Sequence, residues 1–404
     1  MPSIELQYLR DLLAAKGLDL LSIDNGEPLS SDAERLDSWQ RSGYAAEMQF
    51  MQRPAELLSE PKRLMPNLKS IWVLGLRYAS NQTPERPAGY GRVARYAWGL
   101  DYHSYSKELL APVIQEFRTQ LGDSFEFRIF SDAVPLLERA LARRSGLGFI
   151  GKNTLLIRPG VGSFFFLAEI LTNLEVSNAT PVNTNFRGCS TCTRCLDHCP
   201  TGALEPHQLD ARKCISYLSI EKRGFLNDWQ SKALGEWVFG CDLCQEICPF
   251  NHSAQQHFGE VIGIRSSRLL ETQNILPGFF PERGVGPLLK LEELLQLRTN
   301  SAFKQRYSTS ALMRAGRKGL LRNAACVAAN TQAEFLRPAL LLAAEDSVAS
   351  VRWHALKAII EIDQGIKSAE VDCLFQKLRQ PNSLLEKDSV PDVLIQELEQ
   401  KALI

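Results

Sequence analysis

The stretch CSTCTRCLDHCP, from Cys189 to Pro200, decides how the rest of the chain is interpreted. It spaces four cysteines by two, two and three residues and follows the last one with proline. A second run, CDLCQEICP, spans Cys241 to Pro249 and repeats the last three cysteines of that pattern. Eight of the ten cysteines of the chain lie between residues 189 and 248, so sulfur chemistry dominates this region.

The first run has the spacing of bacterial two-cluster ferredoxins, in which the fourth cysteine ligates the other [4Fe–4S] cluster. The second run lacks one cysteine, because Val238 stands where a complete copy would have it, and Cys214 is the remaining cysteine of the region. Counting ligands with this crossover predicts two complete sites. These are Cys189, Cys192, Cys195 and Cys248 for the first, and Cys199, Cys214, Cys241 and Cys244 for the second.

A pair of structural zinc sites is the alternative interpretation of these cysteines. Zinc sites are typically built from paired Cys-x2–4-Cys hooks, and the continuous run with its terminal proline has a different shape. The spacing therefore favours iron–sulfur clusters. The two remaining cysteines, Cys326 and Cys373, stand alone in helical sequence, and we expect both to be buried small apolar residues.

The composition describes a globular chain with balanced charge. Of its 404 residues 45% are apolar and 23% are charged, and 46 basic residues balance 46 acidic ones. This argues against a protein that coats a polyanion, although a local basic face remains possible. The N-terminal MPSIELQYLRDLLAAKG indicates an amphipathic helix rather than a secretory signal, and no apolar run reaches the ~18 residues of a membrane span. We expect a cytoplasmic protein without membrane contact, in which clustered cysteines bind metal.

Strands and helices are predicted to alternate before the cysteines. The patterns predict strands over residues 70–78, 125–132 and 163–173, and helices over residues 101–121 and 133–146, which indicates an α/β (α+β) domain. The expected domains are an α/β domain over residues 1–180, a ferredoxin-like two-cluster module over 181–260, and a linker with an all-α domain over 261–404.

The C-terminal region contains two similar helical segments, LLRNAACVAAN and SVRWHALKAII. Their arginines, Arg322 and Arg352, lie 30 residues apart, which is typical of HEAT-like repeats with a short period. An unrelated pair of amphipathic helices is the alternative.

A formal G-x-G-x-x-G motif runs from Gly146 to Gly151. The dinucleotide fingerprint must follow a strand and open a helix, whereas this motif follows the predicted helix LLERALARRS. We therefore interpret the glycines as the end of that helix and the start of a loop, and do not predict a nicotinamide site.

Asp132 is the candidate acid, because it ends a predicted strand at the edge of the sheet. A desolvated carboxyl group there would hold a proton at neutral pH. The alternative is that Asp132 caps a helix beginning at Ala133. His103, in the segment RVARYAWGLDYH, is a second candidate site residue. The alternative interpretation is that it is an ordinary histidine at the surface or hydrogen-bonded in a helix.

Six segments spread over about residues 40–255 together resemble the epoxyqueuosine reductase family. They are VARYAWGLDYH, SDAVPLLERALARRSGLGFIGKNTLLI, GSFFFLAEILTN, CSTCTRCLDHCPTGAL, ARKCISYLSIE and FGCDLCQEICPFN. The resemblance implies that the α/β domain binds cobalamin and that two [4Fe–4S] clusters, with the ligand sets counted above, supply electrons. The implied reaction is the reduction of epoxyqueuosine to queuosine at the tRNA wobble position, with Asp132 as the proton donor.

The resemblance also implies residues that contact cobalamin. These are Arg53, Tyr96, Trp98, His103, Lys152, Asn153 and Ser163. Because the indole of Trp98 is a poor metal ligand, we expect base-off cobalt with weak or no lower ligation. For the tRNA anticodon stem-loop, the basic candidates are Arg314, Arg317, Lys318 and Arg322, and an ordinary solvated helix surface is the alternative.

Two other functions are compatible with the clusters. A reductive dehalogenase-like corrinoid enzyme would share the cofactors, but such enzymes carry an export signal with twin arginines, whereas Arg143 and Arg144 are internal. A ferredoxin-type electron carrier would bind no corrinoid and would not depend on Asp132. For the enzyme we expect an external low-potential donor of flavodoxin or ferredoxin type, and a monomer.

Overall fold

The computed structural model describes residues 3–78, 84–122, 125–179, 186–252, 275–366, 368–379 and 389–402. The chain divides into two compact units, each assembled from three stretches. Unit 1 contains residues 1–82, 99–212 and 242–284, and unit 2 contains residues 83–98, 213–241 and 285–404. The units therefore interleave along the chain, unlike the three consecutive domains that we expected. Both expected boundaries, at residues 180/181 and 260/261, lie outside the described residues.

Unit 1 is built on a four-stranded antiparallel sheet. Its strands, in spatial order, are β2 (Leu20–Asp24), β3 (Ser70–Arg77), β8 (Phe165–Thr172) and β5 (Phe127–Phe130). Every residue of β3 is buried, as its continuous apolar pattern predicts for a central strand. The three predicted strands are confirmed, and the sheet is antiparallel throughout.

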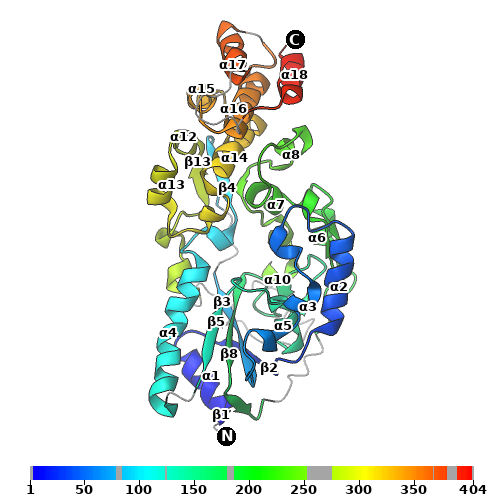
Figure 1. The fold of residues 1–404 in the computed structure, drawn as a ribbon, viewed down its shortest axis with the longest axis vertical. Helices are drawn as coiled ribbons and strands as arrows, with labels where there is room; N and C mark the ends of the chain where they lie inside the picture. The colour runs from blue at the N-terminus through cyan, green and yellow to red at the C-terminus, as the bar shows by residue number, and fades with distance from the viewer. Residues whose placement is uncertain are drawn as a thin grey trace. The chain divides into compact units, whose positions relative to one another are not determined.

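Helices cover both faces of this sheet (Figure 1). Helix α4 (Tyr102–Leu121) packs on one face, where Phe117 meets the Trp72 ring edge-on at 5.2 Å. Helix α5 (Glu138–Arg144) packs on the other face, where Leu141 joins Val73 in one apolar cluster. Neighbouring residues of a strand point to opposite faces, so Trp72 and Val73 contact different helices.

The predicted helix over residues 101–121 is confirmed, including its ends. The Asp101 carboxylate caps the first turn by accepting from the His103 N–H at 2.9 Å, and Gly122 ends the helix at φ 78°. The helix predicted over residues 133–146 begins later, at Glu138. Pro135 explains the delay, because proline disfavours helical backbone in the preceding residue, Val134.

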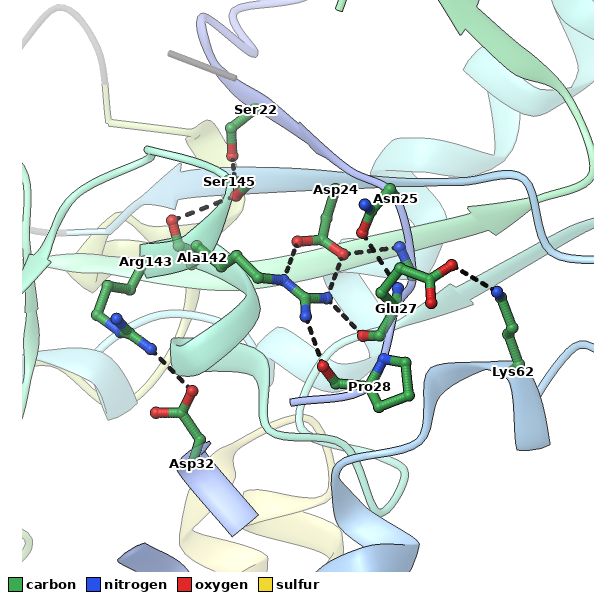
Figure 2. Close-up of polar contacts among 12 residues, drawn as sticks. Ser22, Asp24, Asn25, Glu27, Pro28, Asp32, Lys62, Ala142, Arg143 and Ser145 are labelled. Atoms are coloured by element: carbon green, nitrogen blue, oxygen red, sulfur yellow. Dashed lines mark hydrogen bonds and ion pairs between the residues drawn. The ribbon is translucent and has the colours of Figure 1, made fainter. Parts of the chain in front are cut away.

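Ion pairs fix helix α5 against β2 and the loop that follows it (Figure 2). The Arg144 guanidinium donates to both oxygens of Asp24 at 2.8 and 2.7 Å and to the carbonyl oxygens of Glu27 and Pro28. Arg143 pairs with Asp32 at 2.8 Å. Both internal arginines therefore hold the end of α5 in place.

The G-x-G-x-x-G motif ends helix α5, as predicted. Gly146 adopts φ 82°, and the N–H of Leu147 donates to the Ala142 carbonyl at 2.8 Å. This is the usual way in which a glycine terminates a helix. The motif continues into strand β6 (Phe149–Ile150), which pairs with β7 (Leu156–Ile157), so it opens no helix.

The remaining elements of unit 1 are short and surround the sheet and the cysteine runs. They are β1 (Ser3–Glu5), α1 (Leu6–Ala14), α2 (Ser30–Arg41), α3 (Ala55–Leu58), β9 (Glu175–Ser177), α6 (Arg194–Asp197), β10 (Leu204–Glu205), β11 (Gln208–Leu209), α9 (Leu243–Glu246) and α10 (Pro249–His252). The predicted N-terminal amphipathic helix is α1, and a strand precedes it.

Unit 2 combines a small sheet with helices. The strands are β4 (Tyr90–Val93), β12 (Trp237–Phe239) and β13 (Leu288–Lys290), with β4 in the centre. The helices are α7 (Ile215–Ile220), α8 (Asp228–Ala233), α12 (Leu291–Leu295), α13 (Asn300–Tyr307), α14 (Gly316–Asn330), α15 (Arg337–Ala343), α16 (Ala349–Ile362), α17 (Ala369–Arg379) and α18 (Asp392–Lys401). Helices α14 and α16 are buried almost throughout.

Arg322 of α14 and Arg352 of α16, the two arginines that suggested a repeat, are both buried and both donate to backbone carbonyls. The assignment as HEAT-like repeats stays a prediction. Cys326 is buried, as expected, whereas Cys373 is exposed, so the expectation was wrong for Cys373. Residues in the described part of the chain form no helix long and apolar enough to cross a membrane.

Candidate active site and cluster ligands

Asp132 lies in a strained loop between β5 and α5. Its φ is 50°, in the left-handed region that non-glycine residues rarely adopt, and its side chain is 70% exposed. Its backbone N–H donates to Oε1 of Glu138 at 2.6 Å. The alternative role as the cap of a helix at Ala133 is wrong, because no helix begins there. The expected desolvation of this carboxyl group is also absent in this conformation.

Two side chains at the start of α4 face the Asp132 carboxylate. The Tyr102 hydroxyl donates to Oδ2 of Asp132 at 2.7 Å, and Nε2 of His103 lies 3.9 Å from the same oxygen. Nδ1 of His103 lies 2.7 Å from the Asp101 carboxylate. This hydrogen bond raises the pKa of His103, with further contributions from the charges of Asp101, Asp132 and Glu138. The Nε2 atom of His103 therefore faces Asp132 at ion-pair distance, and the bond to Asp101 favours the protonated imidazole.

Aromatic stacking sets the position of the Tyr102 hydroxyl. The Tyr102 ring lies on Phe166 with a centroid distance of 4.3 Å and an interplanar angle of 10°. The His103 ring stacks on Tyr102 with a centroid distance of 4.0 Å. Sequence reasoning named His103 as a cobalamin contact and missed Tyr102, although the two residues are neighbours.

Two further carboxyl groups, which sequence reasoning also missed, lie behind Asp132. Glu138 opens α5, and burial together with the charge of Asp132 raises its pKa to about 7. Glu169 lies in the middle of β8 with no exposed surface, and burial raises its pKa well above the usual range. The signal was available, because Glu169 interrupts the apolar strand FFFLAEILT.

The thiols predicted for the first cluster interact electrostatically within unit 1. Cys248 is 7% exposed, and burial raises the pKa of its thiol to about 11, with further contributions from the charges of Cys189, Cys195 and Cys192. The backbone N–H of Lys152 points at the Cys189 sulfur at 3.4 Å. Four thiols with an amide donor are the chemical set that a [4Fe–4S] cluster uses.

The cysteines predicted for the second cluster belong to both units. Cys199 and Cys244 lie in unit 1, whereas Cys214 and Cys241 lie in unit 2. Within unit 2, Cys214 is the residue before α7, and Cys241 comes two residues after β12. Among the residues that the structure describes, no three His, Cys, Asp or Glu side chains are grouped so as to hold a single metal ion.

Three residues expected to contact cobalamin have polar groups engaged within unit 1. The Lys152 ammonium donates to the Ser190 carbonyl at 2.9 Å. Asn153 is 3% exposed, and its amide nitrogen donates to the Cys244 carbonyl at 3.4 Å. The Ser163 hydroxyl is 6% exposed, donates to Gln245 and accepts from Asn251. In this conformation these polar groups hold the cysteine loops.

The other expected cobalamin contacts are dispersed among the elements. Arg53 is exposed in the turn before α3, and His103 belongs to the Asp132 cluster described above. Tyr96 and Trp98 lie in unit 2, where the Trp98 indole N–H donates to the Val93 carbonyl at 2.7 Å and its ring is 8% exposed.

The expected tRNA-binding set must be corrected for two arginines. Arg317 is 4% exposed and forms two hydrogen bonds to Asp346 at 2.7 and 2.9 Å. Arg322 is 2% exposed and donates to backbone carbonyls. Both face the interior of unit 2 because α14 is a buried helix. Arg314 is exposed but pairs with Glu221, and Lys318 is exposed.

Comparison with known proteins explains these features. Residues 188–251 match a family model described as a 4Fe-4S double cluster binding domain, and this range holds all eight predicted ligands. Residues 59–133 match the model described as epoxyqueuosine reductase QueG, DUF1730. The epoxyqueuosine reductase of Leadbetterella byssophila is 32% identical over 322 residues, which cover 79% of this chain and 97% of the relative. The chain belongs to the epoxyqueuosine reductase family.

Solved structures of this family share the fold over nearly the whole chain. An epoxyqueuosine reductase crystallised with an epoxyqueuosine-modified tRNA-Tyr stem loop matches with a TM-score of 0.81 and 27% identity, covering 98% of this chain and 99% of that chain. The Bacillus subtilis epoxyqueuosine reductase, solved with an aspartate-bearing catalytic loop swung out of the active site, matches with a TM-score of 0.78 and 26% identity, covering 98% and 99%. The resemblance inferred from the sequence motifs is thus confirmed.

Proposed function

We propose that this chain reduces the epoxide of epoxyqueuosine in tRNA to the cyclopentene of queuosine. The reaction consumes two electrons and two protons and releases the epoxide oxygen as water. The observation that carries the proposal is the group around Asp132, together with family membership. A carboxyl group with a tyrosine hydroxyl and a histidine beside it is suited to protonate a leaving oxygen.

The proton steps follow from the geometry of unit 1. Asp132 delivers a proton to the epoxide oxygen as the carbon–oxygen bond breaks, because an unprotonated alkoxide is a poor leaving group. Tyr102 holds the same carboxylate oxygen that faces His103. His103, whose pKa the Asp101 hydrogen bond raises, then returns a proton to Asp132. The exposed loop at Asp132 gives substrate access to this carboxyl group.

The electrons would come through two [4Fe–4S] clusters. For the first cluster, the thiols of Cys189, Cys192, Cys195 and Cys248 supply the donor set. For the second, Cys199, Cys214, Cys241 and Cys244 stay the ligands predicted from spacing. Because the Cys248 thiol holds its proton to about pH 11 when no metal is bound, cluster assembly must displace that proton.

Cobalamin remains part of the proposal because of the family resemblance. When bound, it would supply a strongly reduced cobalt that passes electrons to the substrate. The side chains of Lys152, Asn153 and Ser163 do not fit the expected direct role, since their polar groups hold the cysteine loops. The side chains around Asp132 therefore account for the proton steps of the reaction.

The proposed macromolecular partner is the anticodon stem-loop of a tRNA that carries epoxyqueuosine. Of the predicted basic residues, Lys318 of α14 is exposed and is the candidate for a phosphate contact. A low-potential donor of flavodoxin or ferredoxin type would reduce the clusters of a monomeric, cytoplasmic enzyme.

Substitution of the proposed acid tests this function. Asp132→Asn should keep iron and sulfide contents unchanged and lower epoxide reduction in a modified stem-loop by about 10²–10⁴-fold, the usual contribution of a general acid. Asp37→Asn, a change at an exposed carboxylate of α2, is the matched control and should retain full activity. Full turnover by Asp132→Asn would refute the assignment. If the wild-type chain holds its iron and can be reduced but does not act on the stem-loop, the function as an electron carrier would be favoured instead.

A further inference from the structure

The conformation of the Asp132 loop needs an explanation of its own. Positive φ at a residue with a side chain persists only where the surrounding structure holds it. Asp132 adopts φ 50°, and the hydrogen bond from Tyr102 holds its mostly exposed side chain but not its backbone. The contacts that hold this backbone therefore lie elsewhere in the loop.

Two hydrogen bonds anchor the loop to rigid elements. The Ser131 hydroxyl donates to the Leu167 carbonyl of β8 at 2.7 Å. The Asp132 N–H donates to the Glu138 carboxylate at 2.6 Å, a short distance that is typical of a charged acceptor. Glu138 in turn belongs to α5, whose far end Arg144 fixes to Asp24. The carboxylate that accepts from the Asp132 N–H therefore belongs to helix α5, which is itself held in place.

The orientation of Glu138 depends on a third carboxyl group. Glu169 has no exposed surface, and neither of its oxygens meets an N–H or O–H donor among the described residues. Its hydrogen-bonding neighbour is the Glu138 carboxyl group. Two carboxyl groups can form a hydrogen bond only if one of them carries a proton, because ionised carboxylates only accept.

The proton belongs on Glu169. Its pKa is raised well above the usual range by burial and by the charges of Glu138 and Asp132. The pKa of Glu138 is raised to about 7, and Arg139 on the same helix opposes that rise. The other group facing this pair is His103 of α4, whose pKa Glu138 helps to raise. Because Glu138 already accepts from the Asp132 N–H whereas Glu169 meets no donor, we place the shared proton on Glu169, which then donates to Glu138.

We propose that Glu138 is the positioning residue for Asp132 and that Glu169 supplies the O–H that orients Glu138. Two hydrogen bonds thus connect the buried strand to the exposed proton donor, one from Glu169 to Glu138 and one from the Asp132 backbone N–H to Glu138. The effect of this arrangement on catalysis rests on the proposed function. The hydrogen bonds themselves do not depend on that function.

Amide hydrogen exchange tests the arrangement without substrate. Glu138→Ala should make exchange of the Asp132 amide about 10- to 100-fold faster, the factor expected when a hydrogen bond to a charged group is lost. Glu169→Leu, which removes the O–H donor, should also speed exchange. Glu169→Gln, whose amide N–H still donates to Glu138, should leave exchange close to wild type. Equal exchange in Glu169→Leu and Glu169→Gln would overturn the role of Glu169, and unchanged exchange in Glu138→Ala would overturn that of Glu138.

Kinetics with the modified stem-loop separate positioning from general structural damage. Glu138→Ala should lower kcat by about 10-fold or more with KM unchanged, because the lost contact orients the acid rather than the substrate. In an Asp132→Asn background the same change should cause no additional loss, since its target is already gone. An additional loss of the same size there would refute the proposal. The exchange experiment tests the two hydrogen bonds even if the chain has no epoxide reductase activity.

Discussion

Substitution of Asn323 by leucine should destabilise unit 2 and disturb the predicted second cluster. Asn323 lies in α14 with no exposed surface, and its amide donates to the Ser219 carbonyl at 2.7 Å and the Val238 carbonyl at 2.8 Å. Ser219 belongs to α7, which begins directly after Cys214, and Val238 belongs to β12, three residues before Cys241. One side chain therefore links the segments that carry two predicted ligands.

The magnitude follows from the groups left without a partner. Leucine has the same branched skeleton as asparagine but bulkier methyl groups and no polar atom, so two buried carbonyl oxygens would lose their donor and Nε of Arg322 would lose its acceptor. At about 1–3 kcal/mol for each of these three orphaned groups, Asn323→Leu should lower the free energy of unfolding by about 3–9 kcal/mol. That is a large part of the ~5–15 kcal/mol that stabilises a typical domain. The thiols of Cys214 and Cys241 would then be held less firmly relative to each other.

Asn330 offers a matched control on the same helix. Its amide donates to the Ser231 carbonyl at 2.9 Å and the Gly235 carbonyl at 3.1 Å, in a segment without predicted ligands. After anaerobic reconstitution, Asn323→Leu should lose iron faster than wild type, toward about four of the roughly eight atoms that two clusters contain. Asn330→Leu should lower the unfolding temperature but retain all its iron. Equal iron retention by the two variants would refute the link between α14 and the second cluster.

Three further outcomes follow from the site. Cys248→Ser should remove one of four thiols and leave about half of the iron, and full iron content would exclude Cys248 as a ligand. Asp101→Asn removes the negative charge and weakens the hydrogen bond that raise the pKa of His103, so the fall of turnover toward high pH should move to lower pH. An unchanged pH profile would show that His103 does not supply the proton. Lys318→Glu should weaken stem-loop binding and reduce its salt slope by about one, whereas Arg317→Met should break a buried ion pair at a cost of about 3–5 kcal/mol in stability. A lowered salt slope for correctly folded Arg317→Met would contradict its interior placement.

The sequence was sufficient for features that depend on short-range spacing. Two cysteine runs predicted an iron–sulfur module that the family comparison confirms, because the ligands of a compact cluster must recur within a few residues. The strand at residues 70–78 and the helix ending at Gly122 were also predictable, since apolar periodicity and capping are local properties. The start of α5 was misplaced, although Pro135 was a local signal for it.

Burial and partnership of charged residues were decided only by the tertiary structure. Arg317 and Arg322 have the sequence character of a basic surface, yet the packing of α14 turns both into the interior of unit 2. Glu169 stands 31 residues from Glu138 in the sequence, and only the pairing of β8 with β5 beneath α5 makes them neighbours. A charged side chain carries the same chemistry on a surface or in a core. Its role is therefore set by desolvation and by the groups that long-range folding places beside it.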